Sequence, residues 1–218
     1  PPAGPHYAVI EPPADRPDLA TTEIVDVQFT SEGKTSDLAF ESAARLFGNI
    51  KIQCPNDPTA VCALGSVATD ATLVFSRPSK IPGMPAYRVT TSTAAGNQRG
   101  FFEVSLPESR CSSIENCEDQ YEVSVIPDNG GTSLSLAQAS PGELAPPFRT
   151  TVVLRGDTEV DWTVGKTETT KTATGCIAFA SGESASGIAV SAFDSQEKRA
   201  SNRAVTNQDG CYTLAVNR

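Results

Sequence analysis

The sequence predicts an all-β protein built from tandem Ig-like or transthyretin-like antiparallel β-sandwiches. Apolar and polar residues alternate in several segments, which is typical of strands with one face on a core. Clusters of Pro, Gly, Asn and Asp separate these segments and predict turns. A set of segments also recurs along the chain. The 218 residues suffice for one large domain or two small ones, and 39% hydrophobic with 20% charged residues is an ordinary globular balance.

The strand predictions follow the alternation in chain order. Five segments place apolar residues at every second position: Val25-x-Val27-x-Phe29, Phe102-x-Val104-x-Leu106, Tyr121-x-Val123-x-Val125, Val160-x-Trp162-x-Val164 and Tyr212-x-Leu214-x-Val216. Turn clusters such as 127–131 and 207–210 lie between them. Only residues 36–47 have a helical pattern, with Leu38, Ala43, Leu46 and Phe47 on one face and Ser36 or Asp37 as the cap. We therefore expect one short helix in a chain of strands.

An internal repeat supports the same class. Five segments recur in matching character: 7–13 with 121–127, 21–27 with 150–154, 48–52 with 175–179, 71–75 with 187–191, and 100–106 with 210–216. The first pair reads Tyr-Ala-Val-Ile-Glu-Pro-Pro and Tyr-Glu-Val-Ser-Val-Ile-Pro, and the third pair begins with Gly48 and Gly175. Because five weak matches are found together, we interpret them as copies of one unit.

The part of the repeat unit that each segment carries predicts the domain organisation. Residues 46–165 form a complete β-sandwich domain, residues 1–45 carry the tail strands of a unit, and residues 175–218 carry the head strands of another. Alone, the head strands would leave exposed a sheet edge and an apolar core face, made by Ile177, Phe179, Ile188, Val190, Tyr212 and Leu214. We expect the two partial segments to pair into a second domain. Pairing within one chain is favoured because it needs no second chain, and head-to-tail pairing between chains is the alternative.

The carboxyl-terminal motifs resemble carboxypeptidase regulatory-like domains. The matching residues are Gly175-Cys176-Ile177, Gly187-Ile188-Ala189-Val190 and Thr206-Asn207-Gln208-Asp209-Gly210-Cys211-Tyr212-Thr213-Leu214. The central unit departs from the pattern, because it holds a long insertion with Cys54 and Cys62 and has 97–102 in place of the Asp-Gly turn. The resemblance implies transthyretin-like, or prealbumin-like, sandwiches that occur in tandem on bacterial surface proteins. It also implies a non-catalytic accessory, spacer or adhesion module.

Charge and hydropathy exclude two classes of partner. The net charge is −9, and the 17 Lys and Arg residues are scattered. Nucleic-acid binding needs clustered basic residues, so no nucleic-acid partner is expected. No uninterrupted apolar run approaches the ~18 residues that cross a bilayer, so no membrane span is expected either.

Six cysteines predict disulfides. Six cysteines allow 15 pairings, and locality favours Cys54–Cys62, Cys111–Cys117 and Cys176–Cys211. A zinc site is disfavoured by the single histidine and the absence of Cys-x-x-Cys, while free buried thiols remain the alternative. Disulfides form in oxidising compartments, so we expect an extracellular, cell-surface or periplasmic location.

No segment has the pattern of a catalytic, metal or cofactor site. His6 is the only histidine and is expected to be a solvent-facing linker residue. Two sets of acids are candidates for acid–base or calcium chemistry: Glu115, Glu118 and Asp119, and Asp157, Glu159 and Asp161. Alternating acids on a strand usually form its solvent face, so we predict no catalytic residue, no metal and no cofactor.

Two other groups of residues suggest different functions. Trp162, Phe148, Tyr87 and Tyr121 could form a platform that stacks on a sugar, although an alternating Trp is more often a core residue. Lys51 could form an isopeptide bond, as in the related B-type collagen-adhesin repeats, with Glu103 as the acid candidate by position.

We therefore expect a non-catalytic structural or adhesive module of a secreted or cell-surface bacterial protein. Its partners would be proteins or neighbouring repeats, with head-to-tail self-association among them. The alternatives are a carbohydrate-binding module with a glycan partner, and the accessory domain of a secreted peptidase or glycosidase.

The cysteine pattern gives a direct test. With all six cysteines paired, alkylation of the purified protein without reductant should add no label in an intact-mass measurement, while alkylation after reduction should label six thiols. Two or more labelled cysteines without reductant would contradict both the pairing and the oxidising location.

Overall fold

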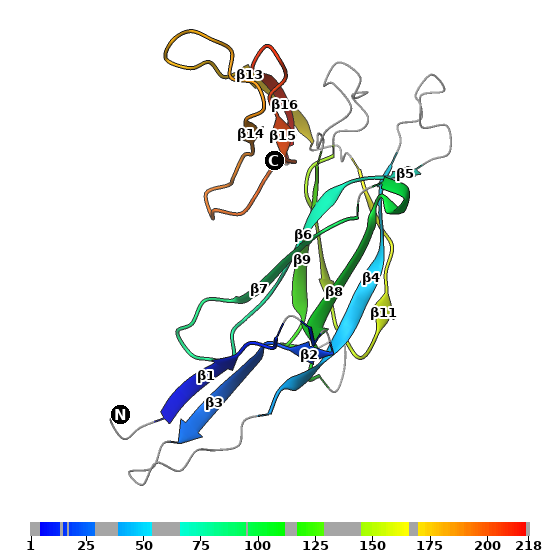
Figure 1. The fold of residues 1–218 in the computed structure, drawn as a ribbon, viewed down its shortest axis with the longest axis vertical. Helices are drawn as coiled ribbons and strands as arrows, with labels where there is room; N and C mark the ends of the chain where they lie inside the picture. Colours follow the sequence, from blue (N-terminus) through cyan, green and yellow to red (C-terminus); the bar gives the residue numbers. More distant parts are fainter. Residues whose placement is uncertain are drawn as a thin grey trace.

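A computed structural model of the chain describes residues 5–13, 15–16, 18–28, 39–53, 66–94, 96–111, 117–128, 145–165 and 170–216. Regular structure in these ranges is almost entirely β-strand, with one 3-10 turn, η1 (Gly96–Gln98). The all-β class is thereby confirmed. The molecule is elongated, with a hairpin at its amino-terminal end, a β-sandwich in the middle and a smaller β unit at its carboxyl-terminal end (Figure 1). No helix in the described ranges is long and apolar enough to span a membrane.

The first sheet of the central sandwich is fully antiparallel. Its strand order is β10 (Phe148–Val152), β9 (Tyr121–Pro127), β6 (Ala71–Arg77) and β7 (Tyr87–Ser92). Burial alternates along β6, where Ala71, Leu73 and Phe75 face the core. The period-2 pattern of the sequence therefore determines which face of this sheet is buried.

The second sheet is organised around β4 (Glu41–Gln53). On one edge β4 pairs antiparallel with β8 (Phe101–Pro107) and then with β5 (Ser66–Ala68). On the other edge it pairs in parallel with β11 (Thr158–Glu159) and β12 (Trp162–Val164). The short β2 (Leu19–Ala20) pairs with its first residues. The parallel ladder arises because the chain crosses over from β10 in the first sheet to the edge of the second.

One apolar core lies between the two sheets. Its fully buried large members include Leu46, Ile50, Leu73, Phe75, Phe102, Leu106, Tyr121, Val123 and Val125. Trp162 packs against this core and stacks on Phe102, with ring centroids 5.5 Å apart and planes 8° from parallel. Burying each large apolar side chain stabilises the fold by roughly 1.5–3 kcal/mol before the cost of ordering the chain.

The predicted helix over 36–47 is wrong in the part that the structure describes. Residues 41–47 belong to β4, a 13-residue strand, while 36–38 lie outside the described residues. Buried positions in β4 fall on even numbers, among them Ala44, Leu46, Ile50 and Ile52. Ladders on both edges hold the segment extended, and this tertiary pairing overrides the local helical pattern.

The amino-terminal hairpin consists of β1 (Pro5–Ile10) and β3 (Thr22–Gln28). The two strands are antiparallel, with a bulge between His6 and Ala8. Among the described strands, β1 and β3 pair only with each other. His6 is half-buried in a strand, so its predicted place in a solvent-facing linker is wrong.

The carboxyl-terminal unit contains two short antiparallel pairs. β13 (Lys171–Cys176) pairs with β16 (Cys211–Val216), and β14 (Ala189–Val190) pairs with β15 (Ala204–Val205). Leu214, Ala204 and Ala185 are buried in this unit. An isolated parallel bridge from Asp128 to Arg203 connects the unit to the central sandwich.

Among the residues that the structure describes, no strand of 1–45 pairs with a strand of 175–218 within this chain. The hairpin and the carboxyl-terminal unit lie at opposite ends of the molecule (Figure 1). Since β12 runs parallel to β4, the chain enters the sandwich at one end and leaves it at the other. The boundary placed at residue 45/46 also falls inside β4, so the central sandwich begins at Glu41 and takes in β2 as well.

Gly48 makes the parallel ladder possible. Its φ is +153°, and a Cβ at this position would lie 1.7 Å from the carbonyl oxygen of Val160. The backbone of 160 approaches β4 here, and the Val160 N–H donates to the Phe47 carbonyl at 2.9 Å. A side chain at position 48 would therefore push the crossover segment off β4.

Gly48→Ala should lower the free energy of unfolding by about 3 kcal/mol, because the new methyl group collides with backbone atoms on a central strand. Gly83→Ala is the control, because Gly83 has φ +79° with open space around it. It should cost about 1 kcal/mol, from the left-handed backbone alone. Urea unfolding followed by Trp162 fluorescence measures both variants, and equal losses would contradict the packing role of Gly48.

Candidate interaction surfaces

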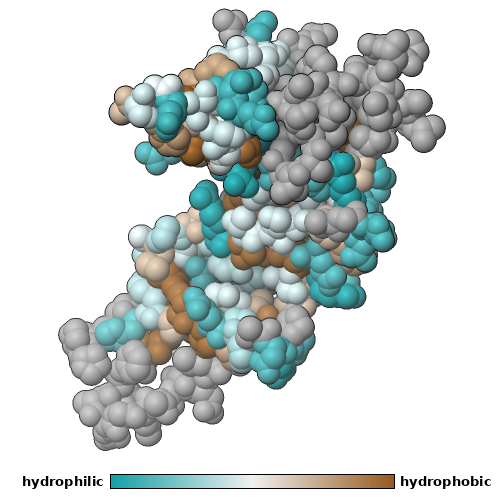
Figure 2. All heavy atoms as spheres, turned by 45° about the horizontal axis from the view of Figure 1, so that its top comes forward, coloured by the Kyte–Doolittle hydropathy of each residue, from teal (hydrophilic) through white to brown (hydrophobic). Residues whose placement is uncertain are grey.

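Exposed apolar side chains gather on the amino-terminal hairpin. Tyr7, Val9 and Val25 are 44%, 48% and 43% exposed, and we name them the hairpin surface. In Figure 2 hydrophobic surface, drawn brown, runs along the lower left of the molecule, toward the end that carries the hairpin. Adjacent to this surface, Glu23 of β3 accepts hydrogen bonds from the Ser79 hydroxyl at 2.7 Å and the Lys80 backbone N–H at 3.0 Å. The hairpin is thereby fixed to the sandwich while its apolar face remains open.

A second apolar surface lies on the carboxyl-terminal unit. Phe179, Ile188 and Phe193 are 55%, 39% and 58% exposed, and we name them the carboxyl-terminal surface. The sequence predicted a core face of Ile177, Phe179, Ile188, Val190, Tyr212 and Leu214. Of these only Leu214 is buried in this chain. The predicted core face is therefore mostly uncovered.

Turn chemistry holds the loops of this unit in place. Asn207 Oδ1 accepts hydrogen bonds from the backbone N–H of Asp209 at 3.0 Å and of Cys211 at 2.8 Å. Gly210 follows with φ +74°, and a Cβ there would lie 2.3 Å from the Ile177 carbonyl oxygen. The motif 206–210 thus builds a specific turn between β15 and β16.

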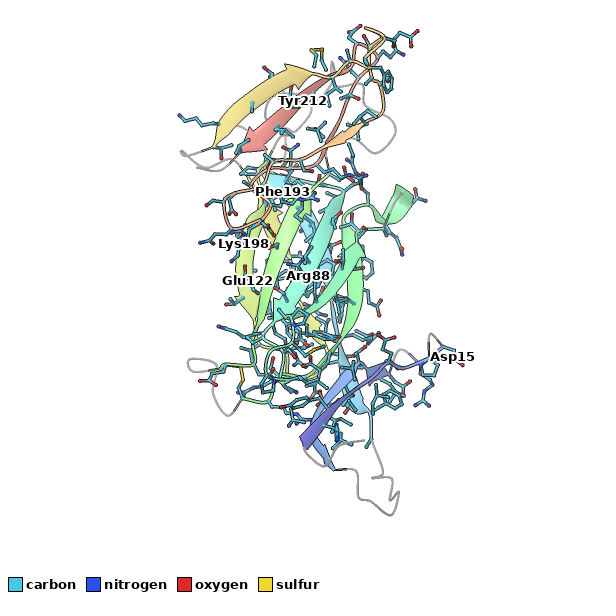
Figure 3. The ribbon with its side chains drawn as sticks, turned by 90° about the vertical axis from the view of Figure 1, so that its left-hand side faces the viewer. Asp15, Arg88, Glu122, Phe193, Lys198 and Tyr212 are labelled. Carbon is cyan, nitrogen blue, oxygen red and sulfur yellow. A yellow bond between two sulfur atoms is a disulfide. The ribbon has the colours of Figure 1, made fainter. Side chains whose placement is uncertain are left out.

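Polar contacts dock the unit on the central sandwich. Lys198 pairs with Glu122 at 3.7 Å, and Arg149 donates to the Arg199 carbonyl at 3.2 Å. Figure 3 shows Phe193 and Lys198 on a loop next to the sheet that carries Glu122 and Arg88. Arg203 pairs with Asp128 at 3.5 Å, but burial raises the pKa of Asp128 more than this arginine lowers it.

A buried arginine that the alternation did not predict lies at the hairpin end of the sandwich. The Arg77 side chain is fully buried, and its Nη1 donates to Asp119 Oδ1 at 3.0 Å. Its guanidinium lies 5.2 Å from the ring centroids of both Tyr87 and Tyr121. Burial raises the pKa of both tyrosines, and the Tyr121 hydroxyl donates to the Pro107 carbonyl at 2.9 Å. The sequence does contain a signal of this burial. Arg77 continues the inward positions Ala71, Leu73 and Phe75 of the same strand.

The alternating acids support the backbone of β4. Asp157 Oδ1 accepts the Arg45 backbone N–H at 2.9 Å, and Asp161 Oδ1 accepts the Asn49 backbone N–H at 2.9 Å. The Arg45 backbone N–H and then its side chain lower the pKa of Asp157. Hydrogen bonds from Lys51 and Asn49 lower the pKa of Asp161. Both carboxylates therefore remain ionised acceptors at neutral pH.

The remaining acid candidates do not form a cluster in the described residues. Glu159 and Glu118 are exposed, Asp119 pairs with Arg77, and Glu115 lies outside the described residues. No group of three or more metal-ligating side chains is found in the part of the chain that the structure describes.

The four aromatic candidates do not form an exposed platform. Tyr121 is fully buried, and Trp162, Phe148 and Tyr87 pack against the core.

Lys51 is not placed to form an isopeptide bond with Glu103. The Lys51 Nζ donates to Asp161 at 3.0 Å, while Glu103 pairs with Arg45 at 3.5 Å. Lys51 and Glu103 are thus not brought together.

The structure contains the disulfides Cys111–Cys117 and Cys176–Cys211. Cys54 and Cys62 lie outside the described residues. The second bridge joins the paired residues of β13 and β16. By loop-closure entropy this 35-residue separation stabilises the unit by about 3.8 kcal/mol.

Comparisons with known proteins identify no family for this chain. No protein-family model matches the sequence, and no curated protein matches it. One solved structure is similar, that of a mutant of the shaft pilin spaA from Lactobacillus rhamnosus GG, at 12% sequence identity. The match covers 80% of this chain and 83% of the pilin chain, with a TM-score of 0.26. At that TM-score the likeness carries no argument about function.

Asp119→Asn should destabilise the protein by about 3 kcal/mol, because it leaves the Arg77 guanidinium as an isolated buried charge. The double variant Arg77→Met, Asp119→Asn removes both charges and keeps an oxygen that accepts the Arg110 N–H. It should lose less stability than Asp119→Asn in urea unfolding. A double variant that is less stable than the single one would contradict this account of the ion pair.

Proposed function

We propose that this chain is a non-catalytic structural module of a secreted or cell-surface protein, which associates with protein partners through its two ends. The observation that carries the proposal is the placement of the hairpin surface and the carboxyl-terminal surface at opposite ends of an elongated molecule. Exposed apolar patches of this kind are typical of interaction sites. The two disulfides favour an oxidising compartment.

The polar residues support a structural role better than a catalytic one. Asp157 and Asp161 are engaged with backbone N–H groups of β4, and Asp119 balances the buried Arg77. An open groove of ≈ 720 Å³ borders β3, but its Glu41 is paired with both Lys80 and Arg110. The aromatic residues considered for sugar stacking pack inward, so the protein-binding role is preferred to a carbohydrate-binding one.

The purified chain should show no turnover above background on peptide and glycoside substrates. The reason is that each candidate acid–base carboxylate in the described residues either supports the fold or is exposed and outside any cluster. The assay compares the wild type with Asp161→Asn, whose amide oxygen can still accept the Asn49 N–H. A turnover that survives repurification and is lost in Asp161→Asn would overturn the proposal.

A further inference from the structure

The carboxyl-terminal unit repeats the strand pairing of the central sandwich. Gly175 pairs with Tyr212 and Cys176 with Cys211 in the β13–β16 ladder. At the equivalent positions of the β4–β8 ladder, Gly48 pairs with Phe102 and Asn49 with Phe101. The β14–β15 pair corresponds in the same way to β6–β7, which precedes β8 along the chain. The unit therefore holds counterparts of β4, β6, β7 and β8.

The correspondence extends to single hydrogen bonds. The Thr206 hydroxyl accepts the Ile188 N–H at 2.8 Å, and the Thr93 hydroxyl accepts the Ala71 N–H at 3.0 Å. The Thr206 N–H in turn donates to the Ile188 carbonyl at 2.9 Å, and the Thr93 N–H donates to the Ala71 carbonyl at 3.0 Å. Such reciprocal pairs fix the start of β14 and of β6 in the same geometry.

The glycine turns match as well. The Ile177 N–H donates to the Gly210 carbonyl at 2.9 Å, and the Ile50 N–H donates to the Gly100 carbonyl at 2.8 Å. Gly210 and Gly100 both have positive φ, +74° and +84°. A Cβ on either glycine would press on the carbonyl oxygen of that same isoleucine.

The hairpin holds the strands that complete such a unit. In the central sandwich β6 pairs with β7 on one edge and with β9 on the other, and β9 pairs in turn with β10. The hairpin is an antiparallel pair like β9–β10, and β1 contains, at Tyr7 and Val9, the Tyr-x-Val motif with which β9 starts. Among the described strands β14 pairs with β15 alone and β1 with β3 alone. The order β3-β1-β14-β15 would thus reproduce the order β10-β9-β6-β7.

Geometry and charge decide which hairpin can dock there. The hairpin of the same chain lies at the far end of the molecule (Figure 1). Residues 5–28 carry five acids and one arginine, so two hairpins repel each other. Residues 170–216 carry four acidic and four basic residues, and this balance does not oppose the hairpin.

We propose that the hairpin of a second copy docks on the carboxyl-terminal unit, so that β1 pairs with the free edge of β14 and the two apolar surfaces cover each other. This inference rests on the proposed function and names the partner. The contact is heterologous, because different ends of the two copies meet, and repetition of it makes an open chain of subunits.

Sedimentation velocity of the full chain tests the proposal. Wild type should form species beyond a dimer that grow with concentration, and Val9→Glu or Ile188→Glu alone should weaken this association at least tenfold. Met84→Glu is the matched control, because Met84 is 51% exposed and lies outside both surfaces. It should associate like wild type. Circular dichroism and intact mass of each variant confirm that the fold and the disulfides are kept.

A mixture of the two variants separates head-to-tail contact from other modes. Val9→Glu retains the carboxyl-terminal surface and Ile188→Glu retains the hairpin surface, so the mixture should give a one-to-one dimer and nothing larger. A wild type that stays monomeric, a dimer that never grows, or variants that still associate would each overturn the proposal. These results bear on self-association alone. The turnover assay tests separately whether the chain is non-catalytic.

Discussion

The pairing of β4 on both edges is the constraint on which the rest of the structure depends. Its buried residues line one wall of the core. One edge of β4 pairs with β8 and β5, and the other edge pairs with β11 and β12. The parallel side requires the backbone at 160 to approach Gly48 more closely than any side chain would permit. It also requires acceptors for two β4 N–H groups, which Asp157 and Asp161 provide.

Local alternation allowed the fold class and five of the described strands to be predicted. These are β3, β8, β9, β12 and β16, which contain the alternating residues at Val25, Phe102, Tyr121, Trp162 and Tyr212. The segment 36–47 misled because Leu46 belongs to two patterns at once. With Leu38, Ala43 and Phe47 it suggests a helix, and with Ala44, Ile50 and Ile52 it continues a strand. Partners more than fifty residues away decide between the two, and a local window does not contain them.

The polar residues were harder to assign for the same reason. Their alternation placed Asp157 and Asp161 on the solvent face of a strand, but it did not reveal their partners Arg45 and Asn49, which lie 112 residues away. Arg77 was missed because a cation at an inward strand position breaks the alternation and is normally read as the end of a strand. Its burial depends on two tyrosine rings and a carboxylate from other segments. Of the six residues expected to form the core face of 175–218, only Leu214 is buried in this chain.

The parallel ladder between β4 and β12 also has a mechanical consequence. A pull between the hairpin and the carboxyl-terminal unit acts along the direction of these strands, because the chain enters by β4 and leaves by β12 at opposite ends. The ladder hydrogen bonds, together with those from Arg45 and Asn49 to the two aspartates, are then loaded in shear and must fail together. A hairpin pulled at neighbouring ends would open one bond at a time. The geometry of this ladder therefore resists a pull along the length of the sandwich.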